Sequence, residues 1–208
     1  MGQDVEPPVR VGILLFEQVD LLDVGGPYEV FLTASRLAQR RGEPVPFEVF
    51  TIGLSGEPVS AYGGLRLIPD RVALESGNLD ILVVPGAVAI NAVAADPALI
   101  EAIRDLAEEA ELTTSVCTGA FLLSDAGLLD GRPWTTHWED VDVLAERSGS
   151  MLGEAGVRWV DDGDVVTAGG LSSGIAMALH VVDRVCGIGL ATATAAQIGY
   201  AWDPSGRV

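Results

Sequence analysis

The stretch TTSVCTGAFLLSDAGLL, residues 113–129, joins a β-branched run to a helix-like pattern, and Cys117 stands at the junction. Threonine and valine before the cysteine favour a strand. The apolar residues after Gly119 recur at helical spacing and lead to a glycine-containing stop. A strand that passes directly into a helix is the building unit of a parallel α/β sheet, which binds ligands at the carboxyl ends of its strands. The stretch therefore predicts an α/β fold with Cys117 at the functional edge of the sheet.

Strands and helices alternate in the same way along the rest of the chain. Short, almost wholly apolar runs predict buried parallel strands at residues 9–16, 47–53, 79–87 and 111–117. Helices are predicted at residues 26–42, 96–110, 118–131, 137–149, 171–187 and 191–202. Glycine-containing turns predict hairpins at residues 57–69 and 157–170. Because the chain has no internal repeat or linker, residues 1–208 are expected to form one domain.

The charge of the chain limits what it can bind. It carries 30 acidic residues against 12 basic ones, a formal net charge of -18, and every basic residue is an arginine. Such a field repels phosphate backbones and anionic membrane surfaces, so binding to nucleic acid or to a membrane is not expected. The most apolar segment, residues 79–99, is interrupted by Pro85, Asn91 and Asp96, which argues against a membrane span.

Cysteine and histidine usage bounds the location and the chemistry. Cys117 and Cys186 are too few for a disulfide framework, and the acidic N-terminus does not have the pattern of a signal peptide. A reduced, cytoplasmic setting is therefore expected. The chain has two histidines and neither a CxxC nor an HxxxH pattern, so no metal site is expected. The glycine-rich segment 168–174 does not match a phosphate-binding loop.

Cys117 is the main candidate for chemistry. A thiol at the start of a helix faces the positive end of the helix dipole and unpaired backbone N–H groups, which favours the nucleophilic thiolate. The alternative is a small buried residue that closes the strand. Cys186 lies late in an apolar helix and is expected to be an inert core thiol.

Other candidates follow from their place along the chain. Asp23 comes after the first predicted strand, and its loop opens at the same sheet edge as Cys117. Its alternative role is to cap the first helix. Gly86 ends another predicted strand, where backbone N–H groups can form an oxyanion hole or an ordinary turn. His137 lies where a strand is expected to pass into a helix, just outside the reacting groups, whereas His180 is expected to be structural.

Five segments together resemble the ThiJ/PfpI family, in the class I glutamine-amidotransferase-like superfamily. In chain order they are VGILLFEQVDLLDVGGPYEVF, LDILVVPGA, TTSVCTGAFLLSDAGLLDGR, TTHWED and VVTAGGLSSGIAMAL, and they span nearly the whole chain. SVCTGA followed by AGLLDGR and TTHW is the specific part. It is most similar to the isocyanide hydratase branch and to the ligand-binding domains of AraC-type regulators. The resemblance implies a homodimer with a flavodoxin-like three-layer α/β sandwich, a mostly parallel sheet and a nucleophile elbow at Cys117.

The resemblance also implies a reaction. In the hydratase branch the residue matching Cys117 adds to the terminal carbon of an organic isocyanide, and the one matching Asp23 holds and activates the thiol and the water. Hydrolysis of the thioimidate then gives an N-substituted formamide, with no metal or organic cofactor. Thr118, directly after the cysteine, is expected to tune or position it. The residues expected to bind substrate or form an oxyanion hole are Gly86, Ala87 and Gly119.

Some positions depart from the relatives' patterns. Thr118 stands where the peptidase-like branch has histidine, which argues against proteolysis by that arrangement. Asp23 is shorter than the glutamate of the deglycase-like branch. Ala87 replaces the second glycine of the usual Pro-Gly-Gly turn and adds a methyl group at the site. Ala176 stands where relatives commonly have aspartate.

Two other functions remain open at this stage, and a small molecule is the expected partner of the protein. One is a binding or sensing module related to the AraC-type ligand domains, with an idle cysteine. No helix-turn-helix segment follows residue 208, so a complete regulator of that type is not expected. The other is a deglycase or redox-stress protein in which Cys117 oxidises to a sulfinic acid.

Overall fold

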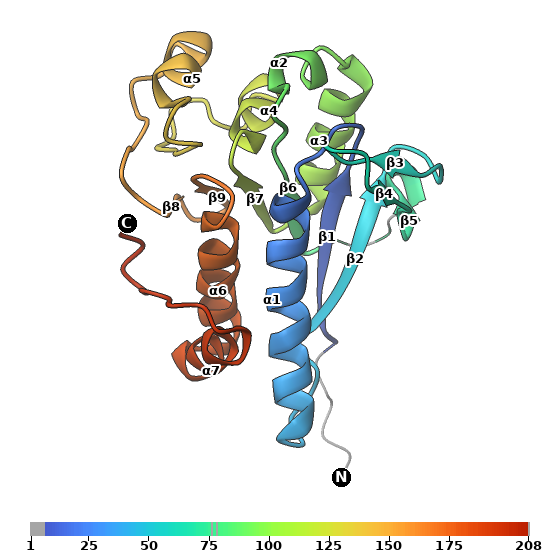
Figure 1. The fold of residues 1–208 in the computed structure, drawn as a ribbon, viewed down its shortest axis with the longest axis vertical. Helices are drawn as coiled ribbons and strands as arrows, with labels where there is room; N and C mark the ends of the chain where they lie inside the picture. The colour runs from blue at the N-terminus through green and yellow to red at the C-terminus, as the bar shows by residue number, and fades with distance from the viewer. Residues whose placement is uncertain (1–6, 76, 78, 208) are drawn as a thin grey trace.

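The computed structural model describes residues 7–75, 77 and 79–207, which form a seven-stranded sheet between two layers of helices (Figure 1). The strand order is β5-β2-β1-β6-β7-β9-β8. Its strands are β1 (Val9–Leu15), β2 (Phe47–Gly53), β5 (Arg71–Val72), β6 (Ile81–Val84), β7 (Leu112–Val116), β8 (Trp159–Asp161) and β9 (Val165–Ala168). All neighbours pair in parallel except β8 and β9. The predicted α/β class with a mostly parallel sheet is confirmed.

Helices cover both faces of the sheet. One layer contains α1 (Leu21–Arg40), α6 (Ser173–Cys186) and α7 (Ile188–Ile198), which contact one another, and the other contains α3 (Pro97–Glu109) and α4 (Gly119–Asp125). Shorter elements fill the connections: the antiparallel hairpin of β3 (Val59–Ser60) and β4 (Arg66–Leu67), a 3₁₀ turn (Ala73–Glu75), α2 (Ile90–Val93) and α5 (Val141–Ser148). None of the helices in the described ranges is long and apolar enough to cross a membrane.

The central strands are buried on both faces, which explains their nearly continuous apolar sequences. Every residue of β6, β7 and β9 is buried. The polar side chains of β7 are accommodated locally. Thr114, for example, donates its hydroxyl to the carbonyl of Leu82 across 3.0 Å. The two predicted hairpins are also confirmed, as β3–β4 and β8–β9.

Helix α1 begins earlier than the predicted residue 26. Asp20 caps it, since Oδ1 accepts from the backbone N–H of Leu22 at 3.1 Å. The first turns bury Val24 and Pro27 against the core, and this packing offsets the weak helix propensity of the glycine-rich sequence there. The alternative prediction that Asp23 caps the helix is therefore wrong, because Asp23 lies inside the first turn and is fully buried.

The bounds of α4, α5 and α7 also differ from the prediction: α5 begins at Val141 and not at residue 137, and α7 ends at Ile198 and not at residue 202. Helix α4 ends at Asp125 and not at residue 131, because Gly127 takes a positive φ of 80° that interrupts the helix. Helix α7 begins at Ile188, ahead of residue 191, directly after Gly187. Helix α3 agrees with the prediction, with Asp96 as its N-cap.

Four loops meet at the carboxyl ends of the central strands, and hydrogen bonds tie them together. The backbone N–H of Asp20, after β1, donates to the carbonyl of Gly86, after β6, at 2.9 Å. The backbone N–H of Cys117, after β7, donates to the carbonyl of Gly169, after β9, at 2.9 Å. The fold therefore fixes residues that are far apart in sequence around one point at the sheet edge.

Candidate active site

Cys117 sits on a sharp turn between β7 and α4 with a left-handed backbone, φ +55°. Its N–H is shared between the carbonyls of Ala168 and Gly169, and its carbonyl accepts from the hydroxyl of Thr136 at 2.8 Å. For a residue with a side chain this conformation costs about 1–3 kcal/mol, and these bonds hold it in place. Cys117 as a residue is 8% exposed. This is the predicted strand–nucleophile–helix elbow.

Gly119 explains how the elbow packs so tightly against the sheet. A Cβ placed there would lie 2.3 Å from the carbonyl oxygen of Val84 and 2.9 Å from that of Pro85. The first turn of α4 therefore passes directly over the end of β6, and only glycine fits. Gly119 is part of the site through this close approach, while its predicted contact with substrate stays a prediction.

Asp23 lies beside the thiol with no exposed surface. Its Oδ2 accepts from the backbone N–H of Gly86 at 3.0 Å, and its Oδ1 has no hydrogen-bond partner among the described residues. Burial, against the opposing effect of the Gly86 N–H, raises the pKa of Asp23 to about 7, and the nearby charge of Asp20 adds to the shift. At neutral pH the carboxyl group is thus poised between its protonated and ionised forms.

The side chain of Cys117 is protonated at neutral pH. Burial and then the charge of Asp23 raise its pKa to about 12, although backbone N–H groups of Leu171 and Thr118 oppose this shift by bonding the sulfur. The prediction that the helix dipole lowers the pKa is therefore wrong. The reason is physical: α4 has only 7 residues, whereas the thiol is removed from water and faces a carboxylate.

The side chain of Thr118 bonds a neighbouring loop and not the reacting groups. Its Oγ1 accepts from the backbone N–H of Ala87 and donates to the carbonyl of Ala87, each across 2.9 Å. The N–H of Gly86 is bonded to Asp23, so Gly86 and Ala87, two of the three residues predicted to bind substrate or form an oxyanion hole, have N–H groups with acceptors. Their contact with substrate stays a prediction, and the N–H groups that bond the sulfur come from Thr118 and Leu171.

The two histidines and the second cysteine occupy different surroundings. The ring of His137 packs on Gly170, where a Cβ would lie 2.8 Å from Cδ2, so it supports the loop that carries Leu171. It lies in the loop before α5, not at the start of a helix. His180 is bonded to Asp161 at 2.7 Å, in keeping with its predicted structural role. Cys186 ends α6 and is only half-buried, which corrects the prediction of a core thiol.

This arrangement matches a known family over most of the chain. The DJ-1/PfpI family matches residues 9–184. The chain belongs to the DJ-1/PfpI family. It is 33% identical to the isonitrile hydratase of Pseudomonas putida over 196 residues, which cover 94% of this chain and 80% of that protein.

Other proteins similar to this chain include a transcriptional regulator. The HTH-type transcriptional regulator GbdR of Pseudomonas aeruginosa is 26% identical over 93% of this chain, which spans 51% of that protein. Among solved structures, a ThiJ/PfpI family protein from Pseudomonas syringae superposes with a TM-score of 0.82 and 26% identity, covering 96% of this chain and 78% of that one. The ThiJ/PfpI resemblance of the sequence is thus confirmed, while the family alone does not decide the activity.

Sequence reasoning missed one contact of this DJ-1/PfpI site. Leu171 bonds the sulfur through its backbone N–H, and a backbone group leaves no mark in the residue type. The available signal was the segment AGGLSSG, whose place after β9 puts it at the same sheet edge as Cys117. The described residues contain no group of three or more His, Cys, Asp or Glu side chains that could hold a metal ion.

Proposed function

We propose that this protein is a cysteine-dependent hydro-lyase that adds water to an organic isocyanide and releases an N-substituted formamide. One observation carries the proposal: a fully buried carboxylate, Asp23, with an unpartnered Oδ1, acts electrostatically on the thiol of Cys117. The 33% identity to an isonitrile hydratase over nearly the whole chain supports the same chemistry.

In the first step the ionised Asp23 is the base. The thiol of Cys117 is neutral at neutral pH, so the sulfur becomes a strong nucleophile only as it loses its proton. Sγ attacks the terminal carbon of the isocyanide, the S–C bond forms, and the thiol proton passes through the carboxyl of Asp23 to that carbon. The product of this step is a thioimidate on Cys117, in which the former isocyanide carbon carries one hydrogen.

In the second step water replaces the sulfur. Asp23 takes a proton from the water as its oxygen adds to the thioimidate carbon, and a proton goes to the nitrogen. Collapse of the tetrahedral species breaks the C–S bond, gives the formamide and returns the proton to sulfur. The N–H groups of Leu171 and Thr118 stabilise negative charge on the sulfur in both steps. A carboxyl group with a pKa near 7 suits a role that alternates between base and acid.

The decisive experiment is a direct assay. The protein is incubated with an aryl isocyanide, and formamide is followed by chromatography. Turnover is expected for the wild type and for Cys186→Ala, the matched change at the other cysteine, and no turnover is expected for Cys117→Ala. A wild type that produces no formamide, or turnover that persists in Cys117→Ala, would overturn the proposal.

A second candidate is a small-molecule binding module with an idle cysteine. It is favoured by the 26% identity to GbdR across 93% of the chain. Under this alternative an isocyanide is not consumed, so the same assay separates the two. The redox-stress alternative is less well supported, because oxidation to a sulfinic acid starts from a thiolate and the pKa of Cys117 is raised to about 12.

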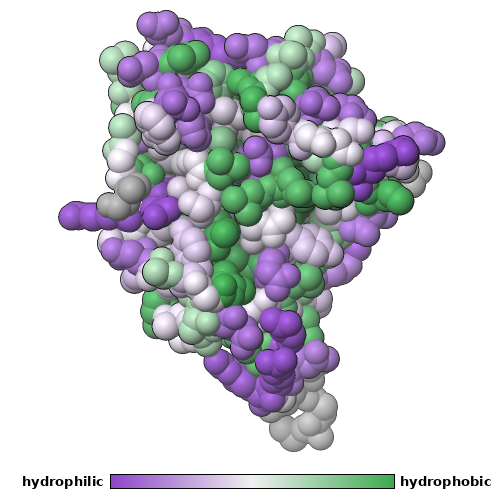
Figure 2. All heavy atoms as spheres, viewed as in Figure 1, coloured by the Kyte–Doolittle hydropathy of each residue, from purple (hydrophilic) through white to green (hydrophobic). Residues whose placement is uncertain are grey.

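We also propose that the protein works as a homodimer. Apolar side chains gather in a band that crosses from the start of α1 to the β3–β4 hairpin (Figure 2). Leu22 is 42% exposed there, Leu65 53% and Ile68 71%. A contiguous apolar surface of this kind is typical of an interface. Sedimentation should give a dimer mass for the wild type and a monomer mass for Leu65→Glu combined with Ile68→Glu, and a monomeric wild type would refute the dimer.

A further inference from the structure

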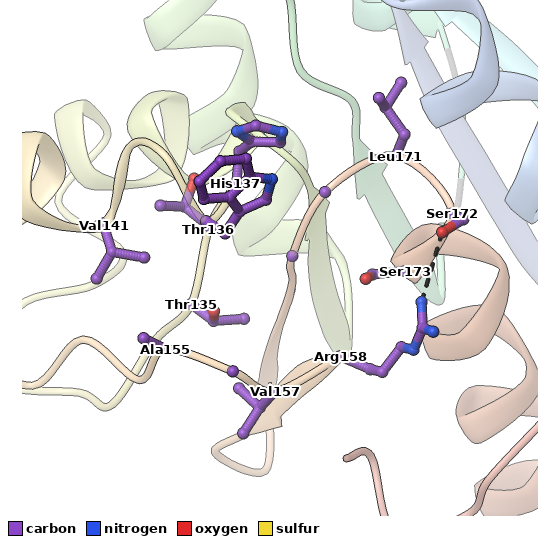
Figure 3. A pocket seen from close by; sticks show the side chains of 14 residues that line it. Thr135, Thr136, His137, Val141, Ala155, Val157, Arg158, Leu171, Ser172 and Ser173 are labelled. Carbon is purple, nitrogen blue, oxygen red and sulfur yellow. Dashed lines mark hydrogen bonds between the residues drawn. The ribbon is translucent and has the colours of Figure 1, made fainter. Parts of the chain in front are cut away.

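A second concave site is lined in part by the loop that follows β9, whose Gly169 accepts a hydrogen bond from the backbone N–H of Cys117 (Figure 3). Its volume is about 350 Å³, near the lower end of the range for small-molecule pockets. Residues of this pocket include Thr135, His137, Val157, Arg158, Leu171 and Ser173. Cys117 and Asp23 are not among the residues that line it, so the reaction proposed above does not use it.

Arg158 gives the pocket an uncompensated positive charge. Within the described ranges four arginines are half-buried, and three of them, Arg10, Arg71 and Arg132, are ion-paired with carboxylates. The fourth, Arg158, has no carboxylate within ion-pair distance in that part of the chain. Its guanidinium is held only by a long 3.4 Å bond to the hydroxyl of Ser172 (Figure 3). In a chain with net charge -18, a half-buried arginine without an acidic partner is a group available to bind an anion.

Ser173 supplies an independent sign of a ligand. The residue is 6% exposed, it lines the pocket, and none of the described groups hydrogen-bonds its hydroxyl. It is also the first residue of α6, a helix of 14 residues, so the positive end of that helix dipole points the same way. An unpartnered hydroxyl on a buried residue, an arginine without a carboxylate partner and a helix N-terminus in one pocket fit an acceptor oxygen that carries negative charge.

The remaining walls select the rest of the ligand. Val141, Val157 and Leu171 are apolar residues of the pocket, and Figure 3 draws the side chains of the two valines across the hollow from Ser173. A bare inorganic anion would leave this surface unfilled. We propose that the pocket binds a small organic carboxylate, with the carboxylate between Arg158 and Ser173 and a short apolar body against the valines.

The position of Leu171 links the two sites. Leu171 is one of the residues of the pocket, and its backbone N–H bonds the sulfur of Cys117. A ligand in the pocket therefore contacts the same loop that donates to the nucleophile. Binding itself does not require the thiol, so it is testable whether or not the hydratase proposal holds.

The test uses the intact protein and titration calorimetry with benzoate, and with benzamide as its neutral isostere. Benzoate is expected to bind the wild type, Cys117→Ser and Arg36→Gln alike, because neither Cys117 nor Arg36 lines the pocket. Arg36 is an exposed arginine on α1 and serves as the matched control. Arg158→Gln and Ser173→Ala are each expected to weaken benzoate binding by about tenfold or more, since each loses a hydrogen bond to a charged group. Benzamide is expected to bind at least about tenfold more weakly than benzoate.

Three results would overturn the assignment. The first is no benzoate binding to the wild type at millimolar concentration. The second is a ligand preference or dependence that is missing: benzoate and benzamide bind equally, or benzoate binds each of the two variants, Arg158→Gln and Ser173→Ala, as tightly as the wild type. The third is loss of binding in Cys117→Ser, which would move the ligand to the nucleophile. Circular dichroism melting of each variant distinguishes a lost contact from a lost fold.

Discussion

Gly86 donates its backbone N–H to Oδ2 of Asp23 across 3.0 Å, and this bond orients the carboxyl group so that Oδ1 remains the free oxygen. The contact joins the end of β6 to the first turn of α1. Glycine is required at residue 86, because a Cβ there would lie 2.8 Å from the backbone nitrogen of Thr118. One close approach thus sets both the direction of the base and the position of the elbow.

The first prediction concerns the pH dependence of turnover. Since the pKa of Asp23 is raised to about 7, kcat/KM for the isocyanide should rise with pH and level off above that value, as the carboxyl group becomes a base. Asp23→Asn has a neutral amide in the same place and should lower kcat/KM on the order of 10²–10⁴-fold. Initial rates across the pH range check this. An unchanged pH profile in Asp23→Asn would contradict the assigned role.

The second prediction is a gain in stability from the same change. Between the ordinary value of 3.8 and the folded value of about 7, the folded state keeps a proton that the unfolded chain has released. The stability contributed by the protonated carboxyl is therefore present below about pH 4 and is lost as the pH rises to about 7. Asp23→Asn stays neutral throughout.

Urea unfolding of the two proteins at both ends of that window tests the effect. The difference in unfolding free energy should move in favour of Asp23→Asn by about 4 kcal/mol from the acidic to the neutral end. A difference that does not change with pH would mean that the pKa of Asp23 is not raised by folding, and would contradict the assignment.

The third prediction concerns the reactivity of the thiol. With its pKa raised to about 12, Cys117 should react with iodoacetamide at neutral pH more slowly than a free cysteine, by a factor on the order of 10³. Asp23→Asn removes the neighbouring charge and should accelerate the reaction on the order of tenfold. Alkylation is followed by mass spectrometry in a Cys186→Ala background, so that a single thiol is counted. A wild-type rate at or above that of free cysteine would refute the raised pKa.

The fourth prediction separates structure from chemistry at Thr118. Thr118→Val removes the hydroxyl that satisfies both the N–H and the carbonyl of Ala87, a residue only 2% exposed. Each unpaired buried group costs about 1–3 kcal/mol, whereas Thr118→Ser keeps both bonds. Chemical denaturation should therefore show a clear loss of stability for valine and a small one for serine. Equal losses in the two variants would mean that the methyl group, not the hydroxyl, matters.

Most of the fold was predictable because strands that are buried on both faces have nearly continuous apolar sequences. The apolar run of β6 and the β-branched run of β7 indicate strands covered on both faces. The start of α3 is indicated by its N-cap, Asp96, and by the proline that follows it. The start of α1 was missed, since the glycines and proline after Asp23 favour a loop when considered locally. Tertiary packing decides that segment, and packing is not a local property.

The candidate site was predictable in membership but not in electrostatics. Cys117 and Asp23 were expected together because their loops open at the same carboxyl edge of the sheet. The pKa of the thiol depends on how much water reaches it and how close the carboxylate lies, and neither quantity is encoded in residue order. The same holds for Leu171, and for the N–H groups of Gly86 and Ala87, whose hydrogen bonds exist only in the folded chain.

The left-handed backbone of Cys117 has a consequence for any attempt to engineer this protein. Glycine adopts φ +55° without strain, so Cys117→Gly relieves a conformational cost that every other side chain at this position keeps. Selection of a variant library for heat resistance alone should therefore enrich glycine at residue 117, and these variants lack the thiol. Thermostabilised variants should be chosen by turnover as well as by melting temperature, because at this one residue the two selections pull in opposite directions.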